Sequence, residues 1–164
     1  MIACLDVDYR PDSAVAACVL LEDWTSPRTF LEILRRLGPA APYEPGQFYK
    51  RELPCLQEVL SYVREPLEAI VIDGYVWLGE NQPGLGAHLY SDLGSETPIV
   101  GVAKKRFAGA VHAEEIYRGM SRRPLYITAI GVPQGHAAAQ IARMHGPHRI
   151  PDALQRADRL CRTA

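Results

Sequence analysis

Two apolar stretches near the start of the sequence constrain the fold most. Residues 2–9 (IACLDVDY) and 13–22 (SAVAACVLLE) are separated only by Arg10-Pro11-Asp12, which is a turn signal. They predict two strands joined by a tight turn, and hence an antiparallel hairpin. Residues 28–36 (RTFLEILRR) fit either a third strand or a helical turn, because their periodicity does not decide between the two.

Beyond a break at Gly38-Pro39, helical and strand patterns alternate along the chain. Residues 48–65 place apolar side chains at helical spacing, with Pro54 expected in the first turn. A hairpin followed by such an alternation indicates an α/β fold with a mixed sheet, and 164 residues fit one domain spanning residues 1–164. The further elements that we predict are strands at 67–74, 97–105 and 124–131 and helices at 85–94, 136–145 and 150–162.

Composition narrows the class of protein. An apolar fraction of 48% with 23% charged residues is typical of a folded globular chain and argues against disorder. No run approaches the roughly eighteen apolar residues of a membrane span, and the first residues lack the basic region of a secretory signal. We therefore expect a cytoplasmic protein without a membrane partner. We also expect a monomer. Four cysteines without CxxC pairing are expected to be buried free thiols rather than zinc ligands: Cys4, Cys18, Cys55 and Cys161.

Three carboxylates carry the clearest chemical signal. Asp6 interrupts one apolar strand and Asp73 ends another, and a charge at such a position is costly unless it is compensated. Glu52 lies at the front of a predicted helix, where the helix dipole alone would favour it. Each residue has an ordinary structural explanation, but a shared cation explains all three. Mg²⁺, or Mn²⁺ in its place, takes hard oxygen ligands and can activate water for phosphodiester hydrolysis. Nucleotide cofactors are not expected, because the sequence has neither GxxxxGK[ST] nor GxGxxG.

The strings around these carboxylates resemble, in order and along nearly the whole chain, the motifs of the endonuclease V family. The strings PYxPG…RE and PxxGVAKK are specific, and their shared order makes coincidence improbable. The matching segments are LDVDY (5–9), PYEPGQFYKRE (42–52), VIDG (71–74), GAHL (86–89), PIVGVAKK (98–105), PLYIT (124–128) and RIPDALQRADRL (149–160), the last of which resembles the family's closing RLPEPLRLAD.

This resemblance implies an RNase H-like fold and metal-dependent hydrolysis near a deaminated base (inosine) in DNA or RNA. It implies that Asp6, Glu52 and Asp73 are the catalytic metal ligands. Lys104 would contact the scissile phosphate and stabilise its developing charge. Tyr43 corresponds to a wedge that fills the space left by a displaced base. The other residues expected to bind nucleic acid are Pro42, Pro45, Gly46, Gly74, Tyr75, His88 and Lys105.

Two stretches depart from the family pattern. The family continues VDG with HG-x-x-HPRR, whereas this chain has Tyr75 at the first histidine and Gly79-Glu80-Asn81-Gln82 in place of HPRR. Trp77, in the same loop, either stacks on a base or covers the core. Near residue 130, Val132 aligns with a metal ligand and cannot bind metal, which leaves His136 as the alternative ligand. Two further hypotheses therefore stay open: a nucleic-acid-binding protein with impaired catalysis, and a metal hydrolase of small phosphoesters.

Overall fold

The amino-terminal strands form the predicted hairpin. The structure is a computed structural model that describes residues 1–39, 47, 49–94 and 96–164. In it β1 (Ile2–Tyr9) and β2 (Ala14–Leu21) pair antiparallel along their full length. The ambiguous segment is a strand, because β3 (Leu31–Leu37) pairs antiparallel with β2 and alternates between exposed and partly buried residues, as an edge strand does.

Within the described ranges these strands belong to a seven-stranded sheet of order β3-β2-β1-β4-β7-β9-β8. The centre is parallel, since β4 (Ala69–Asp73) pairs with both β1 and β7 (Ile99–Ala103). Beyond β7, β9 (Leu125–Ile130) pairs antiparallel with β7, and the edge strand β8 (Glu114–Ile116) pairs antiparallel with β9. The predicted α/β class with a mixed sheet is therefore confirmed. Neither β8 nor the small hairpin of β5 (Trp77–Gly79) and β6 (Gln82–Pro83) was predicted, because such short strands show no period.

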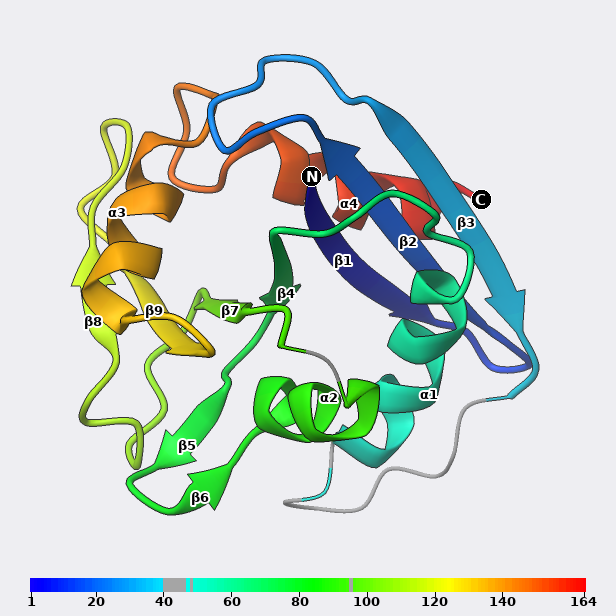
Figure 1. The fold of residues 1–164 in the computed structure, drawn as a ribbon, viewed down its shortest axis with the longest axis horizontal. Coiled ribbons are helices and arrows are strands. Elements are labelled where there is room, and N and C mark those ends of the chain that lie inside the picture. Colours follow the sequence, from blue (N-terminus) through cyan, green and yellow to red (C-terminus); the bar gives the residue numbers. More distant parts are fainter. Residues whose placement is uncertain (40–46, 48, 95) are drawn as a thin grey trace.

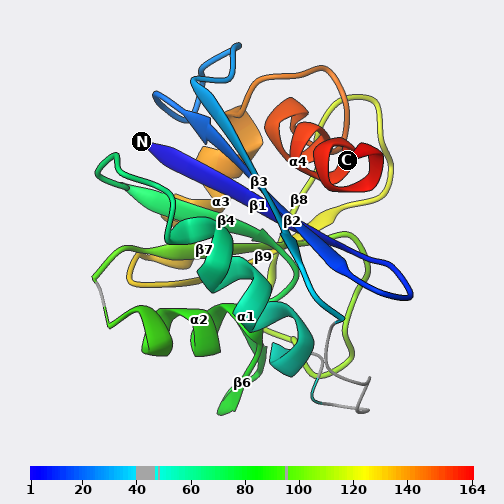
Figure 2. The same cartoon turned by 90° about the vertical axis from the view of Figure 1, so that its right-hand side faces the viewer.

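Helices cover both faces of the sheet, as Figures 1 and 2 show. Side chains alternate along β1: Ala3 and Leu5 pack in one core cluster, and Ile2 and Cys4 pack in the other. The first cluster is closed by helices α1 and α2, and the second by α3 and α4. The helices are α1 (Tyr49–Leu60), α2 (Leu85–Leu93), α3 (Gln134–Arg143) and α4 (Asp152–Thr163).

Three smaller predictions can be compared with the structure. Pro54 lies in the second turn of α1 and not in its first, because the described helix already begins at Tyr49. All four cysteines are within the described ranges, and all are buried and free, as expected. Among the helices of the described residues, none is long and apolar enough to cross a membrane.

Candidate active site

Asp6 and Asp73 lie side by side where the parallel pairing of β1 with β4 ends. Leu5 of β1 pairs with Ile72 of β4, so the next residue on each strand is an aspartate. Both aspartates follow the alternation that directs Cys4 and Val71 toward the face covered by α4. Together with Lys104 they line a small hollow that is closed by the start of α4.

Glu52 approaches this pair from α1, on the opposite face of the sheet. It is only 5% exposed, and its Oε2 atom has no hydrogen-bond partner among the described residues. Asp73 and Glu52 both line a larger cavity of about 290 Å³ on that side. Asp73 thus lines both hollows and stands between Asp6 and Glu52.

Burial and mutual repulsion perturb two of these carboxyl groups. Burial, and then the negative charge of Asp73, raise the pKa of Asp6 to about 7. Burial, and then the charges of Asp6 and Asp73, raise the pKa of Glu52 to about 8. A group of carboxyls that resists ionisation in this way is typical of a functional site, because a bound cation would remove the repulsion.

Lys104 already supplies one positive charge to this site. It follows β7, and its Nζ atom donates to Asp73 Oδ2 at 2.5 Å. Burial lowers the pKa of Lys104, but the hydrogen bond and charge of Asp73, helped by Asp6 and Asp158, outweigh burial and raise the pKa overall. Lys104 therefore remains a cation beside the carboxylates.

Asp158 is an acidic residue that the sequence analysis did not single out. It lies on α4, and its negative charge contributes to the raised pKa of Asp6 and of Lys104. Its side chain is 35% exposed and pairs with Arg162 at 2.8 Å. The signal was present in the sequence, because RIPDALQRADRL matches the family's RLPEPLRLAD and Asp158 falls on the last aspartate of that string.

His136 does not lie with the carboxylates, and its prediction as a metal ligand requires correction. β9 is antiparallel to β7, with Ile130 opposite Ile99 at the beginning of β7. Residues that follow β9 therefore stand at the edge of the sheet opposite the carboxyl ends of β1 and β4. Val132 and His136 are both at that opposite edge, where the His136 ring contacts Gln140 Nε2 at 3.1 Å.

Several residues expected to bind nucleic acid surround the larger cavity. Gly74 and Tyr75 line it directly. The Tyr75 hydroxyl donates to the carbonyl oxygen of Lys105 at 2.8 Å and accepts from the backbone N–H of Phe107, so it ties the cavity wall to the loop after β7. His88 stands behind the wall, stacked on the Tyr49 ring with centroids 3.7 Å apart.

The chain reaches this cavity by crossing over β7 immediately after Asp73. A Cβ atom at Gly101 would lie 2.6 Å from the carbonyl oxygen of Gly74 and 2.8 Å from the Val76 nitrogen, so only glycine permits the crossing. Gly74 itself has φ of 143°, a conformation that other residues rarely adopt. The predicted residues Pro42, Tyr43, Pro45 and Gly46 lie outside the described residues.

The donor chemistry of the site fits a divalent cation, although the side chains are not gathered around one point. In the described part of the chain, no group of three or more His, Cys, Asp or Glu residues is placed to hold a metal ion. Asp73 is engaged with Lys104, and Glu52 reaches in from the other face. The unpartnered Oε2 of Glu52 and the repulsion between the carboxyls are nevertheless what a hard cation would satisfy.

The sheet order and the neighbouring carboxylates of β1 and β4 define the class, which is an RNase H-like α/β protein. The sequence profile of the family described as Endonuclease V matches residues 1–140. Endonuclease V of Streptomyces avermitilis is 31% identical over 98% of this chain and 78% of its own length. That of Ignicoccus hospitalis is 29% identical over 97% of this chain and 80% of its own length. The chain therefore belongs to the endonuclease V family, a family of nucleases.

Solved structures agree with this assignment. The crystal structure of the Streptomyces avermitilis endonuclease V superposes with a TM-score of 0.80 at 26% identity, covering 99% of this chain and 79% of that one. Ciona intestinalis endonuclease V, solved with a 23mer DNA containing an inosine, also superposes with a TM-score of 0.80, at 18% identity and covering 99% and 83% of the two chains. The predicted RNase H-like fold is thus confirmed.

Proposed function

We propose that this protein is a Mg²⁺- or Mn²⁺-dependent endonuclease that hydrolyses a phosphodiester bond near inosine in DNA or RNA. The observation that carries the proposal is the buried, mutually repelling set of Asp6, Glu52 and Asp73 beside Lys104. A fold alone does not need this arrangement, because neutral residues at the same places would avoid the repulsion.

Asp6, Glu52 and Asp73 would hold the cation, with Asp158 as a fourth acidic group from α4. When bound, a divalent cation supplies an activated water and charge neutralisation at the phosphate oxygens. Cation binding requires Asp6 and Glu52 to lose their protons, since the raised pKa of each favours the neutral form in the metal-free protein. Asp73 would also have to exchange part of its contact with Lys104 for the cation.

Lys104 then has a role of its own. Released from Asp73 Oδ2, its ammonium group can move to a phosphate oxygen and stabilise the negative charge that develops there. The larger cavity beside Asp73 and Glu52 is lined by Tyr49, Tyr75 and Leu85. These side chains offer an aromatic and apolar surface on which a displaced base can pack. The DNA-bound Ciona relative, whose DNA contains an inosine, supports the choice of hypoxanthine as that base.

The proposal is tested by incubating the protein with end-labelled oligonucleotides that differ by one inosine, as DNA and as RNA, with Mg²⁺, Mn²⁺ or EDTA. We expect metal-dependent cleavage close to inosine and a loss of at least a hundredfold in Asp73→Asn. Asp92→Asn, an exposed residue on α2, is the matched control and should retain activity. Absence of cleavage of every substrate with both metals would overturn the proposal.

A second candidate function is nucleic-acid binding without efficient chemistry. One observation favours it: among the described residues, no group of three or more His, Cys, Asp or Glu side chains is placed to hold a metal ion. The same oligonucleotides distinguish the two functions. A protein that only binds nucleic acid would bind inosine-containing DNA in EDTA, with an affinity that falls as salt rises, and would not cleave it with either metal.

A further inference from the structure

A second cavity lies on the other side of the β5 strand from the proposed active-site cavity. It has a volume of about 190 Å³, which suits one small planar group and is below the range of drug-sized ligand sites. Successive residues of a strand face opposite ways, so Leu78 lines the active-site cavity while Trp77 and Gly79 line the second one. The two cavities thus share β5 as a wall.

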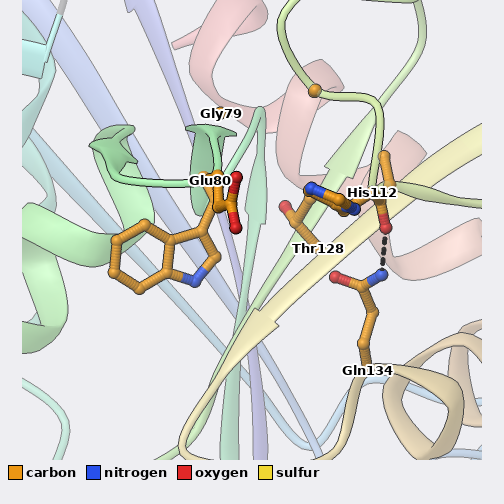
Figure 3. Close-up of a pocket in the computed structure, with 8 residues that line it drawn as sticks. Gly79, Glu80, His112, Thr128 and Gln134 are labelled. Atoms are coloured by element: carbon orange, nitrogen blue, oxygen red, sulfur yellow. Dashed lines mark hydrogen bonds between the residues drawn. The ribbon is translucent and has the colours of Figure 1, made fainter.

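The lining combines an aromatic wall with a polar rim drawn from segments far apart in the chain. Trp77 is held in one orientation, because its Nε1–H donates to the carbonyl oxygen of Ala129 at 3.2 Å. Figure 3 shows Glu80, His112 and Gln134 arranged around the same space, with Thr128 at its base. Glu80 and His112 are exposed at the mouth, whereas Thr128 is buried.

The rim offers two acceptor groups to a ligand, namely the Glu80 carboxylate and the amide oxygen of Gln134. One N–H of the Gln134 amide donates to the carbonyl oxygen of His112, which leaves its Oε1 atom outside that bond. The Thr128 hydroxyl oxygen accepts from the Val76 N–H at 2.8 Å, so its own O–H remains a donor at the base of the cavity. The Glu80 carboxylate accepts and does not donate. A ligand for this cavity therefore needs a flat face for the indole and N–H donors on its edge.

We propose that this cavity is a second nucleobase subsite, selective for a base with an exocyclic amine, which binds a nucleotide near the scissile bond. The inference rests on the proposed nuclease function, because a strand held at one face of β5 brings its neighbouring nucleotides toward the other. Cytosine and adenine present an amine donor, and a carboxylate is the side chain that accepts from the cytosine N4 amine. Unstacked bases are recognised by stacking on an aromatic ring together with hydrogen bonds to their edges.

This selectivity is opposite to that of the active-site cavity. Deamination turns the amine of cytosine or adenine into a carbonyl oxygen, as in uracil and hypoxanthine. In the place of the amine that oxygen would face the Glu80 carboxylate, and two acceptors cannot share a hydrogen bond. The active-site cavity is proposed to take a deaminated base, whereas this cavity would reject one. The residues that create it, Trp77 and Glu80, belong to the loop where this chain departs from the HG-x-x-HPRR pattern.

The test uses the intact ¹⁵N-labelled protein in EDTA and follows its two tryptophan indole N–H signals by NMR. A Trp24→Phe variant assigns the signals, and Trp24, which is buried and donates to Glu68, serves as the internal reference. Two matched pairs of nucleosides are titrated: cytidine against uridine, and adenosine against inosine. We expect cytidine and adenosine to shift the Trp77 signal at concentrations at least tenfold lower than uridine and inosine, with the Trp24 signal unmoved.

Glu80→Gln should reduce this preference to less than threefold, because the added amide NH₂ can donate to a carbonyl oxygen. Glu22→Gln, at an exposed position that does not line the cavity, should keep it. Equal shifts by the members of each pair, an unmoved Trp77 signal, or an unchanged preference in Glu80→Gln would each overturn the inference. Since neither metal nor cleavage enters the titration, its failure is distinguishable from failure of the proposed nuclease activity.

Discussion

Replacing Glu52 with glutamine should stabilise the metal-free protein at neutral pH. Glu52 is buried, and its pKa is raised from 4.5 to about 8, so the folded chain holds it protonated while the unfolded chain ionises it. The stability that protonated Glu52 contributes is therefore fully present below pH 4.5 and is lost as the pH rises toward 8. At about 1.4 kcal/mol for each pH unit above 4.5, the loss at pH 7 is about 3 kcal/mol. Glutamine, which does not titrate, avoids this loss.

The assay is urea denaturation of both proteins in EDTA at pH 5 and at pH 7. The advantage of Glu52→Gln over the native chain should grow by about 2.5 kcal/mol between the two pH values, or by roughly 5–10 °C in Tm. Glu58→Gln is the matched control, since Glu58 lies on the same helix but is half exposed, and its contact with Arg35 at 3.6 Å contributes less than about 1 kcal/mol. A difference that does not depend on pH, or a variant less stable than the native chain at pH 7, would show that the folded chain does not hold Glu52 protonated.

Four further predictions follow from the same geometry. Lys104→Ala should reduce single-turnover cleavage about a hundredfold without weakening Mn²⁺ binding, because the lysine competes with the cation for Asp73. Asp158→Asn should weaken activation by Mn²⁺ whereas His136→Ala should not, as metal titrations of cleavage will measure; the reverse order would contradict the placement of α4. Gly101→Ala should destabilise the fold by about 1–3 kcal/mol in urea, since its Cβ would meet the backbone that crosses β7. Arg118→Met should lower the unfolding free energy by about 3 kcal/mol or more, because the buried guanidinium donates to five carbonyl oxygens along residues 142–149; a near-neutral change would show that water replaces those bonds.

The sequence was sufficient for the hairpin and the two aspartates because their signals are local. Alternation and a turn triplet identify β1 and β2, and a charge inside or at the end of an apolar strand is conspicuous in any sequence. Once β1 and β4 pair in parallel, Asp6 and Asp73 must come together. The short strands β5, β6 and β8 were missed, because two or three residues carry no measurable period.

The placement of His136 and of Asp158 depended on strand direction and helix packing, which hydrophobic patterns do not show. His136 follows β9, and the sequence does not show the direction of β9 relative to β7. The antiparallel pairing places His136 at the edge of the sheet opposite Asp6 and Asp73. Asp158 lies on an amphipathic helix where an acidic residue is ordinary, so only its place in the RIPDALQRADRL string distinguished it. Its proximity to Asp6 arises only because α4 packs against β1, about 150 residues earlier in the chain.

A Mn²⁺ titration, followed by electron paramagnetic resonance of the free ion, measures whether Asp6, Glu52 and Asp73 hold a divalent cation. We expect saturable binding by the native chain. The binding should weaken at least tenfold in Asp6→Asn and in Asp73→Asn, because each loses a metal ligand, and should be unchanged in Asp12→Asn, an exposed turn residue. Equal Mn²⁺ binding by the native chain and all three variants would contradict this expectation.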